Sequence, residues 1–479
     1  MRSLAAAASL LLGIGLAGGA CRTGAPAGEG TAAPASRLDD DGVRDLPGYR
    51  SELVSAPVFG GQVFVMEAGE PTLPTVVFVH GLGESGCRDF YPVLRAVAAH
   101  HHVVAFDLPG FGRSTHANEL YSPARYVEFI HTLLGPRRSG PFDLVGHSLG
   151  GALSLLYAAR YPADVQRLLL IDAAGMLHRK AFVSFAVDAG IDRWLGPLAK
   201  TVKDLATIAS ESAATVMGPV VPEEPDPAVV LQSDSLRKTV LGGEPMRIAA
   251  LATILENFGP AIDAVRAPSW ILWGSNDAIA SPRTGLVLQA RLPAARLTVL
   301  EGAGHDPMES RPAAVEGFLL DALASPAAAP GPRTVAPFPP LPARQGHCAK
   351  ETGARFTGDY AEIEIASCQD VVLKDVHAGS LRIRDSYATV ENTRVVSPGV
   401  ALDIKGSRVM VTASDFTGDV ALEVAGSDLD LAGVLLRGRR KAVHVGGASK
   451  LIFSISRSES PTNRSYLHGV YEFDIGTER

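Results

Sequence analysis

Gly146-His147-Ser148-Leu149-Gly150 lies between a short apolar run, 142–145, and a segment rich in helix-forming residues, 151–160. A Gly-x-Ser-x-Gly between a strand and a helix is typical of a very sharp turn that only small residues near the serine allow. Such a turn lifts the serine hydroxyl above the sheet edge, and the helix that follows favours developing negative charge. Because Gly and Ser are common in turns, the assignment depends on partners elsewhere in the chain.

A serine hydroxyl needs a base and a third group that orients the base. In sheets of this kind the two follow the serine in the order Asp or Glu, then His. The apolar run 269–274 predicts a buried strand that leads into a loop carrying Asp277, and the run 296–300 leads into a loop that delivers His305. Both residues follow strand ends, where open α/β sheets build their sites. We therefore predict that Ser148, Asp277 and His305 come together.

The sequence resembles the α/β-hydrolase family over roughly residues 50–323. Five motifs carry this resemblance: a strand ending in His-Gly at 77–83, an Asp-x-x-Gly-x-Gly-x-Ser turn at 107–114, the serine motif at 146–150, the acid loop at 273–277 and Gly-His at 304–305. One small departure is Pro282, which stands slightly later than in many relatives. The resemblance implies a doubly wound, mostly parallel α/β sheet with a helical cap at about 176–260.

The resemblance also implies roles for individual residues. Ser148 would be the nucleophile, His305 the general base and then acid, and Asp277 the group that orients the imidazole. The backbone N–H groups of Leu82 and Leu149 would form the oxyanion hole. Haloalkane dehalogenases and epoxide hydrolases of this fold carry Asp at the position of the serine, so the serine excludes them.

The implied reaction is hydrolysis of a carboxylic ester, from a small molecule or a lipid, through an acyl-enzyme and without a cofactor. One alternative is hydrolysis of a carbon–carbon bond by the same triad. Another is a non-catalytic surface binding protein. His80, Asp107 and Arg113 are interpreted as structural residues, and Asp306 as a loop cap.

Length and charge set the broad organisation. The chain has 479 residues and a formal net charge of −7, so nothing indicates a nucleic-acid partner. We predict a signal peptide at 1–20, a flexible tether at 21–47, the hydrolase domain at 48–323, a Pro/Ala-rich linker at 324–344 and a repeat domain at 345–479.

The N-terminus indicates export. A short positive start and an apolar stretch, 4–16, precede small residues and Cys21. This resembles a bacterial lipoprotein signal, with Gly18 as a departure where an aliphatic residue is usual. The resemblance implies a lipid anchor on Cys21 and a place in the bacterial cell envelope. Cleavage by ordinary signal peptidase, or retention of the segment, remains open.

Beyond the linker, apolar-polar-apolar triplets recur every 18 to 21 residues, at 363–365, 381–383, 402–404, 422–424 and 443–445. Each is followed by a turn that contains serine: Ser367, Ser386, Ser407, Ser427 and Ser449. This period predicts a parallel β-helix-like domain of about five coils. A small β-sandwich is the alternative, although it does not explain the register. We expect the domain to fold separately and to contact a cell surface or polysaccharide rather than perform chemistry.

The four cysteines fit an exported protein. Cys21 belongs to the predicted anchor, and Cys87 is interpreted as a buried thiol. Cys348 and Cys368 remain as a candidate disulfide, which an oxidising compartment permits. Their spacing does not suggest zinc, and no metal site is predicted.

Overall fold

The structure, a computed structural model, describes residues 42–56, 58–181, 228–292, 294–326 and 338–473. The chain divides into two compact units, 1–39 and 40–479, and every described residue belongs to the second. The predicted signal peptide, Cys21 and most of the tether therefore lie outside the described residues. Within the described ranges, no helix has both the length and the apolar character needed to cross a membrane.

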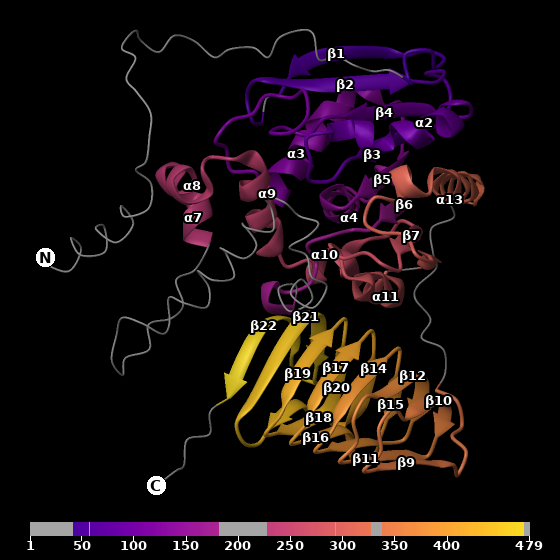
Figure 1. The fold of residues 1–479 in the computed structure, drawn as a ribbon, viewed down its shortest axis with the longest axis vertical. Helices are drawn as coiled ribbons and strands as arrows, with labels where there is room; N and C mark the ends of the chain where they lie inside the picture. The colour runs from indigo at the N-terminus through magenta and orange to yellow at the C-terminus, as the bar shows by residue number, and fades with distance from the viewer. Residues whose placement is uncertain (1–41, 57, 182–227, 293, 327–337, 474–479) are drawn as a thin grey trace, which may run out of the picture. The chain divides into compact units, whose positions relative to one another are not determined.

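An eight-stranded sheet forms the first part of this unit, in the order β1-β2-β4-β3-β5-β6-β7-β8 (Figure 1). Strand β2 pairs antiparallel with β1 and β4, and the remaining neighbours are parallel. The strand bounds are β1 Arg50–Ser55, β2 Gln62–Ala68, β3 Thr75–Val79, β4 His102–Phe106, β5 Phe142–His147, β6 Val165–Ile171, β7 Ser269–Gly274 and β8 Arg296–Leu300. The predicted α/β-hydrolase architecture is thereby confirmed.

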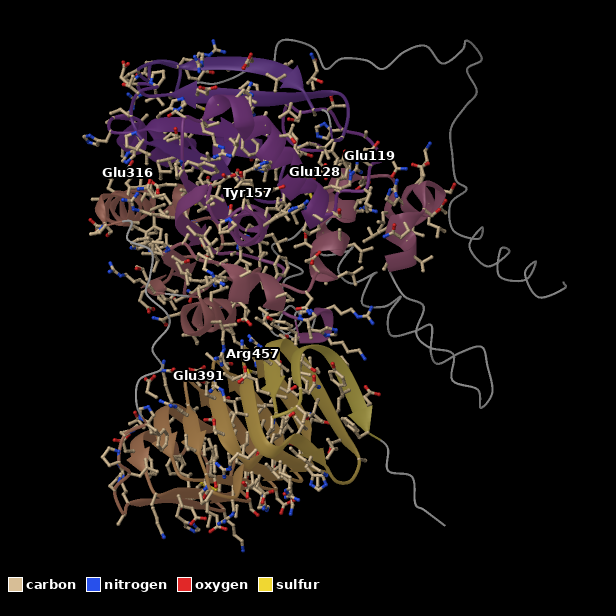
Figure 2. All side chains as sticks on the ribbon, turned by 180° about the vertical axis from the view of Figure 1, so that it is seen from behind. Glu119, Glu128, Tyr157, Glu316, Glu391 and Arg457 are labelled. Carbon is tan, nitrogen blue, oxygen red and sulfur yellow. A yellow bond between two sulfur atoms is a disulfide. The ribbon has the colours of Figure 1, made fainter. Side chains whose placement is uncertain are left out.

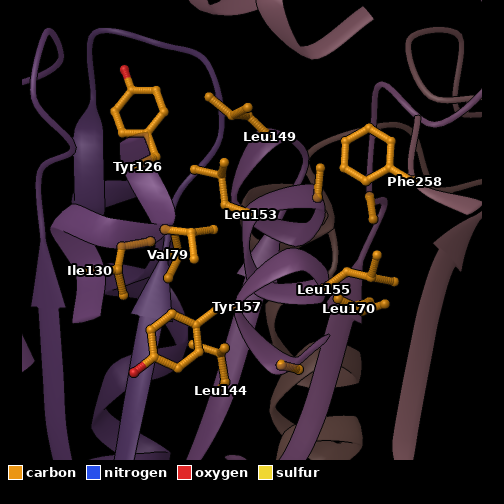
Figure 3. Close-up of a cluster of buried hydrophobic side chains, with 14 of the residues drawn as sticks. Val79, Tyr126, Ile130, Leu144, Leu149, Leu153, Leu155, Tyr157, Leu170 and Phe258 are labelled. Carbon is orange, nitrogen blue, oxygen red and sulfur yellow. The ribbon is translucent and has the colours of Figure 1, made fainter. Parts of the chain in front are cut away.

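Helices cover both faces of this sheet (Figure 1), which explains why its central strands β3, β4 and β5 are buried along their whole length. In β3, Val77 and Val79 pack into one apolar cluster, whereas Val76 and Phe78 pack into another. The first cluster surrounds the helix that follows the serine motif (Figure 3). The covering helices are η2 Gly86–Phe90, α2 Tyr91–Ala98, α3 Pro123–Leu134, η3 Gly135–Arg137, α4 Leu149–Arg160, α11 Pro282–Arg291, α12 Pro307–Ser310 and α13 Pro312–Ala324.

Short helices interrupt the strand alternation where the cap was predicted. They are α7 Ala228–Gln232, α8 Asp234–Leu241, α9 Pro245–Ile254 and α10 Gly259–Ala264. Helix α9 ends at Ile254, and Gly259-Pro260 starts the separate helix α10. Residues 182–227 of the predicted cap lie outside the described residues.

The second part of the unit is a parallel β-helix-like domain. Its five predicted triplets stack in the predicted register, with Ile363, Leu381, Leu402, Leu422 and Val443 paired in sequence. The strands are β9 Gln345–Ala349, β10 Arg355–Tyr360, β11 Glu362–Ala366, β12 Val371–Ala378, β13 Leu381–Arg384, β14 Tyr387–Glu391, β15 Arg394–Val396, β16 Val400–Lys405, β17 Arg408–Thr412, β18 Asp415–Ala425, β19 Asp428–Ala432, β20 Leu435–Val445, β21 Ser449–Glu459 and β22 Arg464–Phe473. Strand β22 departs from the coil pattern, because it pairs antiparallel with β21 and covers the last edge.

Serine hydroxyls connect successive coils. The backbone N–H of Ser386 donates to Ser407 Oγ at 3.1 Å, and the N–H of Ser407 donates to Ser427 Oγ at 3.1 Å. In the earlier coil the ladder position belongs to Cys368 rather than Ser367, since the N–H of Cys368 donates to Ser386 Oγ at 2.9 Å. Cys368 also forms a disulfide with Cys348.

The two parts are in contact through α11 and α10. Arg291 donates to the carbonyl oxygen of Ser414 at 3.1 Å, and Arg457 (labelled in Figure 2) pairs with Asp263 of α10 at 2.6 Å. Ile455 of β21 is buried in the same apolar cluster as Val287 of α11. Removal of the repeat domain would therefore expose apolar surface of the hydrolase domain.

Candidate active site

The serine motif forms the expected turn between β5 and α4. Ser148 has φ +52° and ψ −120°, a conformation that costs a residue other than glycine free energy. The neighbouring glycines permit the turn because a Cβ on Gly150 would lie 1.9 Å from the carbonyl oxygen of Val79. A Cβ on Gly146 would lie 2.3 Å from the carbonyl oxygen of Gly150. The sequence therefore folds locally so that the hydroxyl stands at the carboxyl edge of the sheet.

The three predicted side chains form one hydrogen-bonded chain. His305 Nε2 lies 2.9 Å from Ser148 Oγ, and His305 Nδ1 lies 2.8 Å from Asp277 Oδ2. Ser148 precedes α4, Asp277 follows β7, and His305 follows β8, so three separate loops meet at one sheet edge. The imidazole can take the hydroxyl proton while the carboxylate holds its other nitrogen.

Asp277 is held as an acceptor by its own loop. Its Oδ1 accepts hydrogen bonds from the backbone N–H groups of Ile279 and Ala280, both at 2.8 Å. With His305, the carboxyl therefore receives three N–H donors while its side chain is buried. Hydrogen bonds to both oxygens fix the orientation of the group.

The predicted oxyanion donors belong to two segments that meet at the serine. Leu149 is the first residue of α4, where backbone N–H groups have no partner within the helix. Leu82 lies in the loop after β3. In the same loop, a Cβ on Gly81 would come within 2.8 Å of Ser148 Cβ, so this loop approaches the serine closely. Both positions are adjacent to the nucleophile candidate, and their role as donors stays a prediction.

His80, Asp107 and Arg113 hold the loops around the serine. His80 Nε2 accepts from the N–H of Leu108 at 2.8 Å and its Nδ1 donates to Gly81 O at 2.7 Å, so the ring is neutral. Burial lowers the pKa of His80. Asp107 is fully buried, yet the hydrogen bond and charge of Arg113 outweigh burial and lower its pKa. Their interpretation as structural residues agrees with these contacts.

Sequence reasoning missed the role of His147, the residue before the serine. Its Nε2 donates to the carbonyl oxygen of His305 at 2.8 Å, which fixes the loop that carries His305 against the serine turn. Burial, and then the nearby charge of His305, lowers the pKa of His147 to about 4, so the ring is neutral at pH 7. The motif placed His147 beside the serine but carried no signal of its distant partner.

Three further carboxyl groups lie near the chain of hydrogen bonds. Asp172, which follows β6, is fully buried, and no sequence motif marks it. Burial, followed by the charge of Asp306, raises the pKa of Asp89 to about 7. Asp306 stands at the N-cap position of α12, but its largely exposed side chain caps no N–H, contrary to the prediction. In the described part of the chain, no group of three or more His, Cys, Asp or Glu could hold a metal ion.

Known proteins resemble about half of this chain. The curated relatives include Lipase 1 of Psychrobacter immobilis, 26% identical over 50% of this chain and 73% of the lipase. Monoacylglycerol lipase ABHD6 of Mus musculus is 26% identical over 53% of this chain and 76% of its own. A solved hydrolase from Pseudomonas aeruginosa is 22% identical, with a TM-score of 0.42, over 58% of this chain and 99% of that chain.

The chain also matches a protein family as a whole. Residues 76–318, just over half of the chain, match the Alpha/beta hydrolase family. That span includes the serine turn and the loops that carry Asp277 and His305. The chain therefore belongs to the alpha/beta hydrolase family.

Proposed function

We propose that the protein is a serine hydrolase that cleaves carboxylic esters through an acyl-enzyme, with Ser148, His305 and Asp277 as its catalytic triad. The observation that carries this proposal is the unbroken hydrogen-bond chain from Ser148 Oγ through His305 to Asp277. Membership of the alpha/beta hydrolase family supports hydrolysis as the reaction class.

In this mechanism His305 Nε2 accepts the Ser148 proton as Oγ attacks the ester carbonyl carbon. The imidazolium formed is stabilised by Asp277 and returns the proton to the leaving alkoxide, so an alcohol departs and the acyl group stays on Oγ. Water then attacks the acyl-enzyme by the same steps and releases the acid. The N–H groups of Leu82 and Leu149 would bind the oxyanion, and such a donor contributes about 10²–10³-fold in rate.

The proposed substrate is a small-molecule or lipid ester. Relatives that carry the names Lipase 1 and monoacylglycerol lipase support this class, at 26% identity. A short series of p-nitrophenyl esters, compared with a dienoate-type ring-cleavage product, separates ester hydrolysis from the carbon–carbon alternative. Faster turnover of the dienoate would assign the protein to that alternative.

The test of the reaction is Ser148→Ala in the full chain. We expect loss of p-nitrophenyl ester turnover and of fluorophosphonate labelling together, because both need Oγ. Ser154→Ala is the matched control: it lies on α4, and its buried hydroxyl has no partner among the described residues. A Ser148→Ala protein that still labels and turns over would refute the proposal, whereas an unlabelled wild type would favour the non-catalytic binding protein.

Export to the bacterial cell envelope, with a lipid anchor on Cys21, is a second part of the proposal. It is supported by the sequence of 1–21 alone, which lies outside the described residues. Cys21→Ala should release the protein from the membrane fraction of an expressing bacterium, and unchanged fractionation would contradict the anchor. Contact of the repeat domain with a cell-surface polysaccharide is likewise proposed, and a polysaccharide pull-down of the intact protein tests it.

A further inference from the structure

Asp172 occupies a costly position next to the proposed triad. It follows β6 directly, has φ +44°, and its side chain is fully buried. Its N–H donates to the carbonyl oxygen of Leu272 at 3.0 Å, so the backbone is fixed between β6 and β7. A buried carboxyl on strained backbone requires compensating interactions.

Only one of its oxygens has an evident donor. Asp172 Oδ1 accepts from the N–H of Gly274 at 2.8 Å, whereas Oδ2 is buried without a donor among the described residues. Gly274 also accepts the backbone N–H of Asp277 at 3.2 Å, so the loop that holds Asp172 Oδ1 brings the Asp277 carboxyl close to that of Asp172. Two carboxylates this close do not both ionise, and a shared proton turns one acceptor into a donor.

The surroundings decide which carboxyl keeps the proton. Asp277 receives N–H donors from Ile279, Ala280 and His305, which stabilise its charge. Asp172 receives the single backbone donor of Gly274. Burial, and then the negative charge of Asp277, raises the pKa of Asp172 well above its usual range, and Asp306 adds to this effect.

We propose that Asp172 is a protonated positioning residue, whose Oδ2–H donates a hydrogen bond to the Asp277 carboxylate and fixes the group that orients His305. The proton satisfies the otherwise unpaired Oδ2 and removes the repulsion between the two carboxyls. Asp172 does not contact the reacting atoms and acts through Asp277. This inference rests on the proposed triad for its effect on rate, but not for the protonation itself.

Two substitutions distinguish the effect of the hydrogen-bond donor at position 172 from the effect of losing the whole side chain. In Asp172→Asn the amide keeps a donor for Asp277 and an acceptor for Gly274, and Asn tolerates positive φ. In Asp172→Gly the carboxyl is lost while the backbone conformation remains accessible. Circular dichroism and thermal melting of both full-length variants establish that the fold is kept.

We expect Asp172→Asn to retain wild-type kcat and the wild-type acidic limb of the pH profile of kcat/KM. The reason is that the neutral amide donor of Asn replaces the neutral donor of a protonated Asp. Asp172→Gly should lower kcat about 10–100-fold with little change in KM, as loss of a supporting hydrogen bond does in other sites. Its acidic limb should move to higher pH, because a less well-bonded Asp277 carboxylate holds the His305 proton more tightly.

Two kinetic outcomes overturn the proposal. If Asp172 were ionised, Asp172→Asn would remove a negative charge near His305 and move the acidic limb to lower pH. Wild-type kcat in a folded Asp172→Gly protein would show that the residue positions nothing.

Infrared difference spectroscopy of wild type against Asp172→Asn, without substrate at pH 7, reads the protonation directly. A protonated carboxyl C=O band present only in the wild type supports the proposal, and its absence overturns it. Because this measurement needs no turnover, failure of the inference is distinguishable from failure of the proposed function, which Ser148→Ala tests.

Discussion

The hydrolase domain and the repeat domain bury different kinds of polar side chain. Between residues 345 and 473, the buried polar side chains are all hydroxyls: Ser386, Thr393, Ser397, Ser407, Thr412, Ser414, Ser427, Ser449, Ser454 and Ser456. The described residues from 42 to 326 also bury ionisable groups: Glu67, His80, His102, Asp107, Asp143, His147, Asp172, Arg237 and Asp277. A buried hydroxyl needs only a hydrogen bond, whereas a buried charge needs a partner or a proton.

This difference indicates where chemistry is possible. Several buried ionisable groups of the hydrolase domain cluster at the edge that holds Ser148, where burial and then the charge of Asp277 raise the pKa of Asp172. In the repeat domain, charged residues instead form solvent-exposed pairs such as Arg439 with Asp419. Groups with divergent protonation states are a mark of acid–base sites. We therefore expect catalysis to depend on the first domain and the second to act as a scaffold.

The largest expected effect is on turnover. Asp277→Asn keeps the shape of the side chain but presents an amide N–H to His305 Nδ1, which reverses the tautomer and removes the partner of the imidazolium. We expect kcat for a p-nitrophenyl ester to fall about 10⁴-fold. The control is Asp306→Asn, at the exposed carboxyl next to His305, which should stay close to wild type. If Asp306→Asn lowered kcat more than Asp277→Asn does, Asp306 rather than Asp277 would be the acid of the triad.

Gly150→Ala tests the close approach behind the serine turn. The added Cβ would meet two backbone oxygens, at 1.9 Å from Val79 and 2.5 Å from His80, so β3 or α4 must move. We expect a loss of more than about 4 kcal/mol in the free energy of unfolding, measured by urea denaturation. Gly399→Ala, where an exposed repeat-domain glycine has nothing within 4 Å of a new Cβ, should change it by less than about 0.5 kcal/mol. Equal losses would contradict this reasoning.

Local sequence patterns predicted the strands and the repeat register, but not the tertiary contacts between distant segments. Apolar runs bounded by turn residues predicted the strands before Asp277 and His305, and the repeat period predicted the stacking register. Asp172 was missed because its partner lies on the loop after another strand, and no local pattern records that meeting. The place of Cys368 in the hydrogen-bond ladder was not predicted, because the repeat period alone does not fix which turn residue points inward.

A third prediction compares ion pairs of the two domains. Asp107→Asn leaves Arg113 without its buried carboxylate partner, and the side chains are only 0% and 8% exposed. We expect a loss of about 3–5 kcal/mol in unfolding free energy at neutral pH. Asp419→Asn, in a pair whose side chains are 52% and 53% exposed, should cost about 0–1 kcal/mol.

The same pair gives a pH dependence with a definite sign. The pKa of Asp107 is lowered on folding from 3.8, because Arg113 outweighs the opposing effect of burial. Its carboxylate therefore stabilises the fold fully above that value and progressively less as pH falls through the lowered pKa. Urea titrations at pH 7 and below pH 4 should show the gap between wild type and Asp107→Asn narrowing in acid, and a widening gap would contradict the assignment.

The smallest expected effect concerns a hydroxyl of the repeat domain. Ser407 Oγ accepts the N–H of Ser386 at 3.1 Å and donates to the carbonyl oxygen of Lys405 at 2.8 Å. Ser407→Ala leaves that N–H buried and unpaired, which costs about 1–3 kcal/mol, whereas Ser458→Ala, at a partly buried position outside the ladder, should cost less. Thermal melting measures this, and ester kcat should be unchanged because no ladder serine touches the triad. If Ser407→Ala lowered kcat in a folded protein, the scaffold role would be wrong, since the coils would then help to shape the active site.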